Sequence, residues 1–421
     1  MRSKRLWQLI RLSRRLWVRA TLIALLAILA AIAAVILDPI IPAFLAERIG
    51  EDAVMPILNV LASSMLAVTT FSLSVMVSAH RAASAQVTPR SHRLLLEDTT
   101  TQTVLATFLG AFIFALVSII LFRAGFHGGA APVVVFLFTV FVVALVVLAI
   151  LRWIEHLSRL GSVDETIARV EARTRSTLRR QRAAPSLGAR PLPGPSTIPE
   201  DAAPVPALRG GYVQFVDMAG LSAIAEAAGA EIYVIAAPGT FVVEGAPIAH
   251  VRPADGADAG AIQSAYEIDA IRSFDQDARF ALLVLSEIAS RALSPGLNDP
   301  GTAIDVISRL ERLLAECDPP DDEVRYPALW APSISSDDLV EDAFDAIARD
   351  GAGMIEVMRR LVAALNTLRA GDDAGFARGA DRMIARALDH AERALALEED
   401  RQRLHALAGG VGAPGRQGRG G

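Results

Sequence analysis

Cysteine and lysine are almost absent from this chain of 421 residues, and each shortage excludes a class of protein. The single cysteine, Cys317, cannot form an intramolecular disulfide, so the sequence carries no mark of an oxidising compartment. Lys4 is the only lysine. Beyond the N-terminus, the chain therefore has no lysine to which a cofactor such as biotin or lipoate could be attached. The composition instead indicates a membrane protein, because 52% of the residues are hydrophobic.

Long apolar stretches without Asp, Glu, Lys or Arg dominate the first 151 residues, at 20–37, 57–79, 103–122 and 132–151. As helices, such stretches cross roughly 30 Å of hydrocarbon. A cleaved signal peptide is the alternative for the first stretch, but its apolar run exceeds the roughly 7 to 15 residues of such peptides. We therefore predict an α-helical membrane bundle of about four transmembrane helices over residues 20–151, preceded by a basic N-terminus at 1–19.

Arginine sets the expected orientation of these helices. Basic residues crowd the segment before the first stretch, the loop between the second and third, and the segment after the fourth. Cytoplasmic loops carry such an excess. The Ala-, Arg- and Gly-rich composition is typical of a GC-rich bacterial genome. We expect a multi-pass protein of the bacterial inner membrane with its N- and C-termini in the cytoplasm.

The second stretch carries small, weakly polar residues at spacings of three or four, which place them on one helix face: Ser63, Ala67, Thr70, Ser74 and Ser78. This face is either the wall of an aqueous path or a surface for close helix packing. A similar alanine seam in the first stretch favours a packed bundle and a homo-oligomer. No ionisable side chain lies within a stretch, which argues against proton relays and ion-coupled transport.

Polarity rises after Leu151, and the remainder reads as a cytoplasmic α+β region with a small β module and amphipathic helices. A charged helical stalk is expected at 152–182 and a linker with seven prolines at 183–206. The β module follows at 207–253, the helical cytoplasmic domain at 264–407 and a disordered tail at 408–421. Residues Pro238–Val251 look like the β-sandwich of biotinyl and lipoyl carriers, without the attachment lysine.

A loop between two expected helices reads Ser294-Pro-Gly-Leu-Asn-Asp-Pro-Gly-Thr302. Asp299 before a proline has the form of a helix N-cap. The alternative is an anion or phosphate site at the helix start, formed by Ser294, Asn298, Asp299 and Thr302 with help from Arg272 or Arg291. A weaker alternative is a hard cation held by Asp275, Asp277, Asn298 and Asp299, although no calcium or magnesium loop spacing is present.

The same loop carries a family resemblance. Ala292–Ala303, preceded by Phe274-Asp-Gln-Asp277, resembles the bacterial membrane proteins of the domain of unknown function 2254 family. Residues Ser72–Arg90 resemble that family's second span and cytoplasmic turn, with Thr88-Pro-Arg90 where the family pattern has Ser-Pro-Arg. The resemblance extends over about residues 17–370. It implies a membrane topology and supplies no catalytic residues.

Enzyme signatures are missing: the sequence has no phosphate-binding Gly-Lys loop, no Gly-x-Ser-x-Gly elbow and no His-Glu-x-x-His site. We expect no catalysis, no cofactor, no metal and no nucleic-acid partner. Two functions remain, an oligomeric channel or passive conduit controlled by its cytoplasmic domain, and a non-conducting membrane-anchored sensor or scaffold. A membrane enzyme with a pocket around Asp275, Asn298, Asp299 and Thr302 ranks third. The expected partners are the lipid bilayer and further copies of the chain, and the ligand is unknown.

Overall fold

The computed structural model describes residues 51–86, 88–90, 99–124, 131–157, 162–254, 256–321 and 323–409, together with short helical pieces at 18, 21–26, 28–29 and 32. The chain forms two compact units, which we describe separately. The N-terminal unit extends to Thr166. The C-terminal unit begins at Ile167 and also includes Thr88–Arg90.

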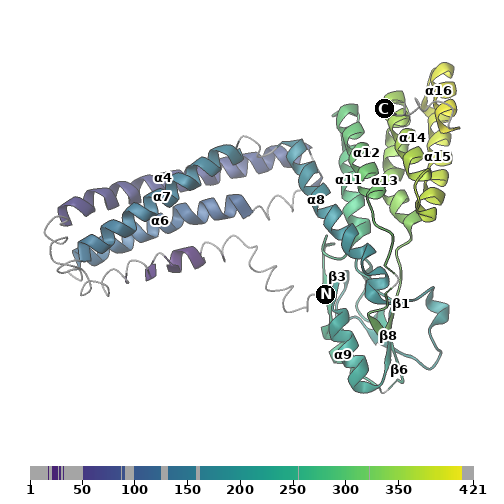
Figure 1. The fold of residues 1–421 in the computed structure, drawn as a ribbon, viewed down its shortest axis with the longest axis horizontal. Coiled ribbons are helices and arrows are strands. Elements are labelled where there is room, and N and C mark those ends of the chain that lie inside the picture. The colour runs from purple at the N-terminus through teal and green to yellow at the C-terminus, as the bar shows by residue number, and fades with distance from the viewer. Residues whose placement is uncertain are drawn as a thin grey trace, which may run out of the picture. The chain divides into compact units, whose positions relative to one another are not determined.

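The N-terminal unit contains three long helices, α4 (Glu51–Gln86), α6 (Thr99–Arg123) and α7 (Ala131–Leu157) (Figure 1). In the described part of the chain, these three are long and apolar enough to cross a membrane. A helix satisfies all its backbone hydrogen bonds internally, as a lipid environment requires. Fully buried side chains, among them Leu58, Phe108 and Phe114, fill the space between the three helices.

The helices match three of the four expected spans and extend several residues beyond them. The first expected span, 20–37, and the basic N-terminus, 1–19, lie almost entirely outside the described residues. Most of the expected tail at 408–421 lies outside them as well.

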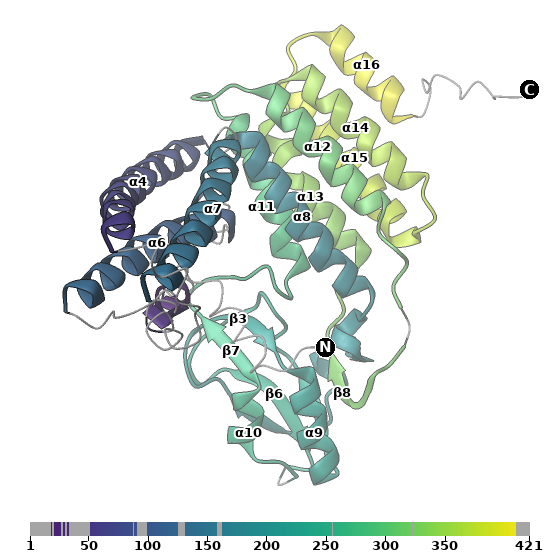
Figure 2. The ribbon, with the colours of Figure 1, turned by 60° about the vertical axis from the view of Figure 1, so that its left-hand side comes forward.

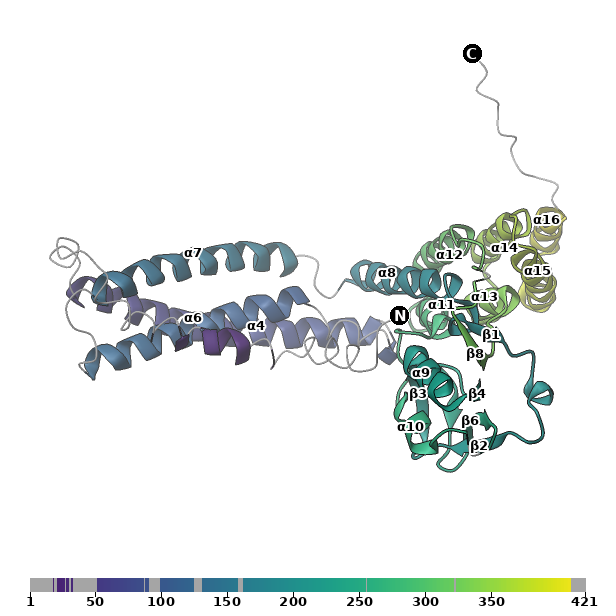
Figure 3. The same cartoon turned by 60° about the horizontal axis from the view of Figure 1, so that its bottom comes forward.

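The C-terminal unit is built around two sheets. Mixed pairing gives the larger sheet the strand order β1-β8-β4-β6-β2, and the smaller sheet is antiparallel with the order β5-β3-β7. The strands are β1 (Ala189–Pro191), β2 (Ala203–Pro206), β3 (Gly211–Val216), β4 (Glu231–Val234), β5 (Phe241–Val242), β6 (Pro247–Arg252), β7 (Tyr266–Asp269) and β8 (Tyr326–Ala331). Helix α9 (Met218–Ala228) packs on one face of the larger sheet, and the β1–β2 connection passes on the other side (Figure 3).

The proline-rich segment expected to be a linker instead supplies both edge strands of the larger sheet. Pro191 lies in β1, and Pro204 and Pro206 lie in β2. Proline lacks an N–H and is therefore confined to strand positions that need no ladder hydrogen bond, which edge strands provide. The prolines mark sheet edges here, together with the short turns η2 (Pro185–Gly188) and η3 (Pro195–Thr197).

The expected β module is not self-contained. Its strand β4 pairs in parallel with β8, which lies about ninety residues further along the chain, and β3 pairs with β7. The module therefore shares its core with segments on both sides, and that core includes Ala189 and Leu329. Two-strand hairpins alone bury too little apolar surface to be stable, which explains the recruitment of distant strands.

Amphipathic helices form the rest of the C-terminal unit (Figure 2). They are α10 (Ala259–Ser264), α11 (Ala278–Ala292), α12 (Pro300–Ala315), α13 (Ser336–Asp350), α14 (Ile355–Arg369), α15 (Ala374–Ala394) and α16 (Glu398–Ala408). Helix α11 packs against α12 and α13, α13 against α15, and α14 against α12, α15 and α16. The end of the expected helical domain contains two helices, α15 and α16, separated at Leu395–Leu397.

Helix α8 (Val163–Arg182) occupies the region expected to be a solvated stalk. Ile167, Val170 and Leu178 on this helix are buried, so one face of α8 belongs to the core of the C-terminal unit. The hydroxyl of Thr174 also donates to the carbonyl of Ala281 in α11, at 3.2 Å. The buried face could not be predicted from the sequence, because the many arginines of α8 indicated a helix exposed to solvent on all sides.

Candidate functional site

The weakly polar face of α4 points away from the other helices of its unit. Ser63, Ala67, Thr70, Ser74 and Ser78 are all exposed. At 100° per residue, they lie on the side of the helix opposite the buried Val54, Leu58, Leu61, Met65 and Ser72. The N-terminal unit therefore packs through one face of α4 and presents the other outward.

Three of the four hydroxyls on this face donate hydrogen bonds within the helix itself. Ser63 donates to the carbonyl of Asn59 at 2.9 Å, Thr70 to that of Leu66 at 2.9 Å and Ser74 to that of Thr70 at 3.0 Å. Such bonds to the preceding turn are the usual arrangement for hydroxyls in membrane helices. They leave the oxygen lone pairs available to water or to a neighbouring helix.

Three further hydroxyls lie inside the bundle, at positions that the sequence pattern did not single out. Ser72, Ser118 and Thr139 are almost fully buried. Thr139 donates to the carbonyl of Val135 at 2.7 Å. Single small hydroxyl residues inside apolar helices have no periodic signal, so the sequence alone could not distinguish them from filler.

The Ser294–Thr302 loop lies on the surface of the C-terminal unit and is held by its own hydrogen bonds. The amides of Leu297 and Asn298 donate to the carbonyl of Ser294, and the Asp299 amide donates to that of Ala292. Asn298 adopts a left-handed conformation with φ 48°. These bonds make the loop a defined turn that leads into α12.

Asp299 caps α12. Its carboxylate accepts from the amide of Thr302 at 3.0 Å and from the Thr302 hydroxyl at 2.5 Å. These hydrogen bonds lower the pKa of Asp299, led by that of the Thr302 hydroxyl. The ionised carboxylate thus occupies the helix N-terminus where the expected anion would bind.

The other residues of the two expected ion sites are engaged elsewhere. Arg272 forms a two-pronged ion pair with Asp277, at 2.8 and 3.0 Å, and Arg173 pairs with Asp275 at 2.5 Å. Within the described residues, no group of three or more His, Cys, Asp and Glu side chains could hold a metal ion. The structure therefore brings Asp299 and Thr302 together, but leaves Asp275 and Asp277 in separate ion pairs.

The Phe274–Asp277 segment anchors the β sheets to the helices. The side-chain amide of Gln276 accepts from the Val216 amide at 2.9 Å and donates to the Val216 carbonyl at 3.2 Å, as a neighbouring strand would. Asp277 caps α11 through the Phe280 amide at 2.9 Å. Burial raises the pKa of Asp277, and Arg272 opposes that shift. The family-like motif therefore has a structural explanation.

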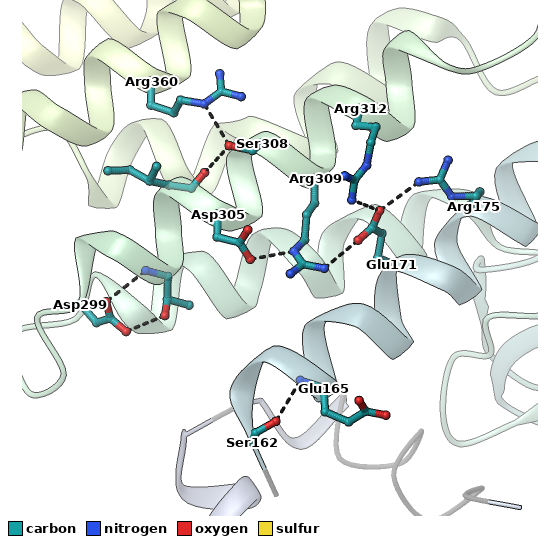
Figure 4. A network of polar contacts seen from close by, with 12 residues as sticks. Ser162, Glu165, Glu171, Arg175, Asp299, Asp305, Ser308, Arg309, Arg312 and Arg360 are labelled. Atoms are coloured by element: carbon teal, nitrogen blue, oxygen red, sulfur yellow. Dashed lines mark hydrogen bonds and ion pairs between the residues drawn. The ribbon is translucent and has the colours of Figure 1, made fainter. Parts of the chain in front are cut away.

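A second polar cluster joins α8 to α12 around Glu171, whose side chain is 8% exposed. Figure 4 shows Glu171 facing three arginines, with Arg309 at 2.8 Å, Arg312 at 2.5 Å and Arg175 at 3.0 Å. Burial alone would raise the pKa of Glu171, but the hydrogen bonds from the arginines outweigh it and lower that pKa. We call this group the Glu171 cluster.

Two arginines of the Glu171 cluster also pair with a second carboxylate. Arg309 also pairs with Asp305 at 2.7 Å, and Arg175 also pairs with Glu316. No pattern in the sequence singled out this cluster. The one available signal was the Glu171/Arg175 spacing of four residues, which is common on solvated helices and does not indicate a tertiary contact.

The chain matches the family described as "predicted membrane protein (DUF2254)" over residues 13–367. It belongs to this family. Uncharacterised proteins of Mycobacterium bovis and Mycobacterium tuberculosis are each 30% identical to it over 294 residues, which is 66% of this chain and 56% of each relative. The chain thus spans little more than half the length of these relatives. No solved structure matches it.

For this DUF2254 member, two surfaces stand out as candidate functional sites. One is the outward face of α4, and the other is the set of polar contacts that fix α8 within the C-terminal unit. The first came from the sequence pattern, and the second required the three-dimensional structure. Neither has the arrangement of nucleophile, base and orienting group that covalent catalysis requires.

Proposed function

We propose that this protein forms an oligomeric passive conduit in the bacterial inner membrane, with the outward face of α4 as its wall. The observation that carries the proposal is the exposure of Ser63, Thr70 and Ser74 on the side of α4 opposite the packed core. Hydroxyls and the carbonyls behind them can line a path for ions or small solutes. The proposal assigns the chain no catalytic step.

The path would have to lie between chains. Leu58, Phe108 and Phe114 fill the space between α4, α6 and α7, so side chains occupy the interior of the described part of the N-terminal unit. Three or four helices of one chain are too few to enclose a pore, whereas several copies with their α4 faces turned inward could do so. A homo-oligomer is therefore part of the proposal.

The proposed topology has four spans and cytoplasmic termini. The arginines that follow α7, including those of α8, and the arginines of the turn after α4 support a cytoplasmic C-terminal unit. With α4, α6 and α7 as three spans, a fourth at residues 20–37 returns the N-terminus to the same side.

Control by the C-terminal unit is supported by two attachments close to the ends of membrane helices. Helix α8 begins at Val163, shortly after α7 ends at Leu157, and the Glu171 cluster fixes it to α12. Arg90, which follows the end of α4, belongs to the C-terminal unit and pairs with Glu287 of α11. A rearrangement of the C-terminal unit would therefore pull on chain segments that continue into α7 and α4.

Ion flux through purified full-length protein in proteoliposomes tests this proposal. Ser74→Leu adds bulk to the proposed wall and should reduce the flux, whereas Ala144→Leu adds the same side chain at an exposed position of α7 and should leave it unchanged. Equal effects of the two substitutions would refute α4 as the wall.

A second candidate is a non-conducting membrane-anchored sensor or scaffold, favoured by the extensive ion pairing that integrates α8 into the C-terminal unit. Such an anchor needs no water beside α4. Single cysteines along the α4 face, in a Cys317→Ala background, distinguish the two functions by their reaction with a membrane-impermeant thiol reagent. Reaction at Ser63, Thr70 and Ser74 supports the conduit, and protection at every position supports the scaffold.

A further inference from the structure

Three large apolar side chains protrude from the C-terminal unit at one place. Leu208 is 68% exposed, Phe241 is 58% exposed and Val243 is 60% exposed. Most of the other strongly exposed large apolar side chains belong to the apolar helices of the N-terminal unit. We call these three residues, with the intervening Arg209, the apolar tip.

Backbone contacts hold the two loops of the apolar tip together. The amide of Ala207 donates to the carbonyl of Ala246 at 2.8 Å, and the amide of Gly245 donates back to the carbonyl of Ala207 at 2.9 Å. Gly245 has φ 83°, a conformation that side chains disfavour, and so allows the tight turn. Exposure of the tip is therefore a property of a fixed structure.

The pattern of the short strand β5 shows that the exposure is unusual. Val242 points into the core of the C-terminal unit, while Phe241 and Val243 on either side of it point outward. The solvated face of an antiparallel strand normally carries polar residues. Here both faces are apolar, and the rings of Phe241 and Tyr212 form a T-shaped pair with centroids 5.1 Å apart.

We propose that the apolar tip inserts into the interfacial layer of the bilayer that the chain's own apolar helices cross. Three side chains are far fewer than the 20 to 30 residues that each partner contributes to a typical protein interface. A tethered bilayer needs much less, because the chain itself keeps the membrane at a high effective concentration. Arg209 is 61% exposed beside the apolar residues and pairs with Glu267 at 3.6 Å, and the exposed Glu244 follows Val243. The tip therefore has no net positive charge, and its attraction to the bilayer comes from the apolar side chains.

Fluorescence of full-length protein in vesicles of phosphatidylcholine and phosphatidylglycerol tests the proposal. Leu208→Cys, Phe241→Cys and Val243→Cys are made separately in a Cys317→Ala background and labelled with an environment-sensitive nitrobenzoxadiazole dye. Leu397→Cys is the matched control, because Leu397 is equally exposed but lies between α15 and α16. Each variant must retain the unfolding temperature of the Cys317→Ala parent, and three positions allow one to be lost.

Insertion predicts that lipids carrying a spin label quench the tip dyes several-fold more strongly than the Leu397→Cys dye. Emission from the tip dyes should also shift to the blue relative to emission from the dye at Leu397→Cys, which stays in water. Equal quenching at the tip and at the control would overturn the proposal. Protection from aqueous iodide without quenching by the labelled lipid would also overturn it, since a protein surface would then cover the tip.

Discussion

The substitution Glu171→Gln tests whether the Glu171 cluster holds α8 in the C-terminal unit. Glutamine keeps the volume and one acceptor oxygen of the side chain but removes its charge. In the structure the carboxylate accepts from Arg175, Arg309 and Arg312, and burial leaves little water to replace them. The substitution therefore leaves three guanidinium groups facing a neutral side chain.

The expected loss can be bounded from the partners. Removing one member of a fully buried ion pair costs about 3 to 5 kcal/mol, because the other charge stays buried and unpaired. Here Arg175 retains Glu316, Arg309 retains Asp305, and Arg312 is half exposed, so water and the second carboxylates offset part of that cost. We expect a loss of roughly 2 to 3 kcal/mol, which lowers the melting temperature of a unit of this size by about 4 to 12 °C.

A maleimide that fluoresces on reaction with a thiol measures this loss specifically. Cys317 is the only cysteine and lies just after α12, so its reaction reports unfolding of the C-terminal unit in the full-length protein. The matched control is Glu316→Gln, which removes the outer, half-exposed carboxylate and should cost about 1 kcal/mol or less. If Glu171→Gln destabilised the unit no more than this control, the cluster would not be holding α8.

Three further predictions concern the pH dependence of the Glu171 cluster, the conformation of Gly239 and the helix cap at Asp299. The stabilisation by Glu171 is present above its usual pKa near 4.5 and is lost as the pH falls through the lowered folded-state pKa, so the melting-temperature gap between wild type and Glu171→Gln should narrow below about pH 4.5. Gly239→Ala should cost at least about 2 kcal/mol in denaturant titrations, since φ is 93° and the new Cβ would lie 2.8 Å from Asp277 Cγ. Asp299→Ala should cost about 1 kcal/mol through loss of the α12 cap, whereas Asp299→Ser should retain most of the stability; equal losses in thermal unfolding would contradict the capping role.

Much of the helical architecture could be predicted from the sequence, because its signals are local. Charge-free apolar runs marked α4, α6 and α7, and periodic apolar residues marked a region of amphipathic helices, which contains α11, α12, α13 and α14. Asp299 before Pro300 marked the start of α12 in the same way. These features depend on residues no more than a few turns apart.

The sheets could not be predicted in the same way, because their order depends on pairing over long distances. Strand β8 inserts between β1 and β4, although it follows them by many residues and several helices. The strands are mostly three to six residues long, too short for a clear alternating pattern. The prolines lie in the two edge strands, whereas the sequence predicted a linker, because a residue without an N–H suits a sheet edge.

The candidate sites show the same difference between features set by local sequence and features set by long-range contacts. The shared face of Ser63, Thr70 and Ser74 follows from helical spacing alone, whereas its outward direction depends on how α4 packs against α6 and α7. The Glu171 cluster and the Gln276 bridge join residues tens of positions or more apart, and no local pattern marks them. The close approach of Gly239 to Asp277 is of the same kind.

The shape of the outer α4 face bears on both candidate functions more directly than its polarity. Because Ser63, Thr70 and Ser74 already donate to their own helix, contact with lipid would cost these hydroxyls little, and polarity alone does not require water. Large exposed side chains, including Leu66 and Phe71, flank the small residues on this face. Small residues on a helix face allow close approach of a second helix, which increases dispersion contacts and displaces lipid. Self-association through α4 is therefore the common requirement of a conduit and of an oligomeric scaffold, and conduction then depends on whether the assembled α4 faces meet each other or surround water.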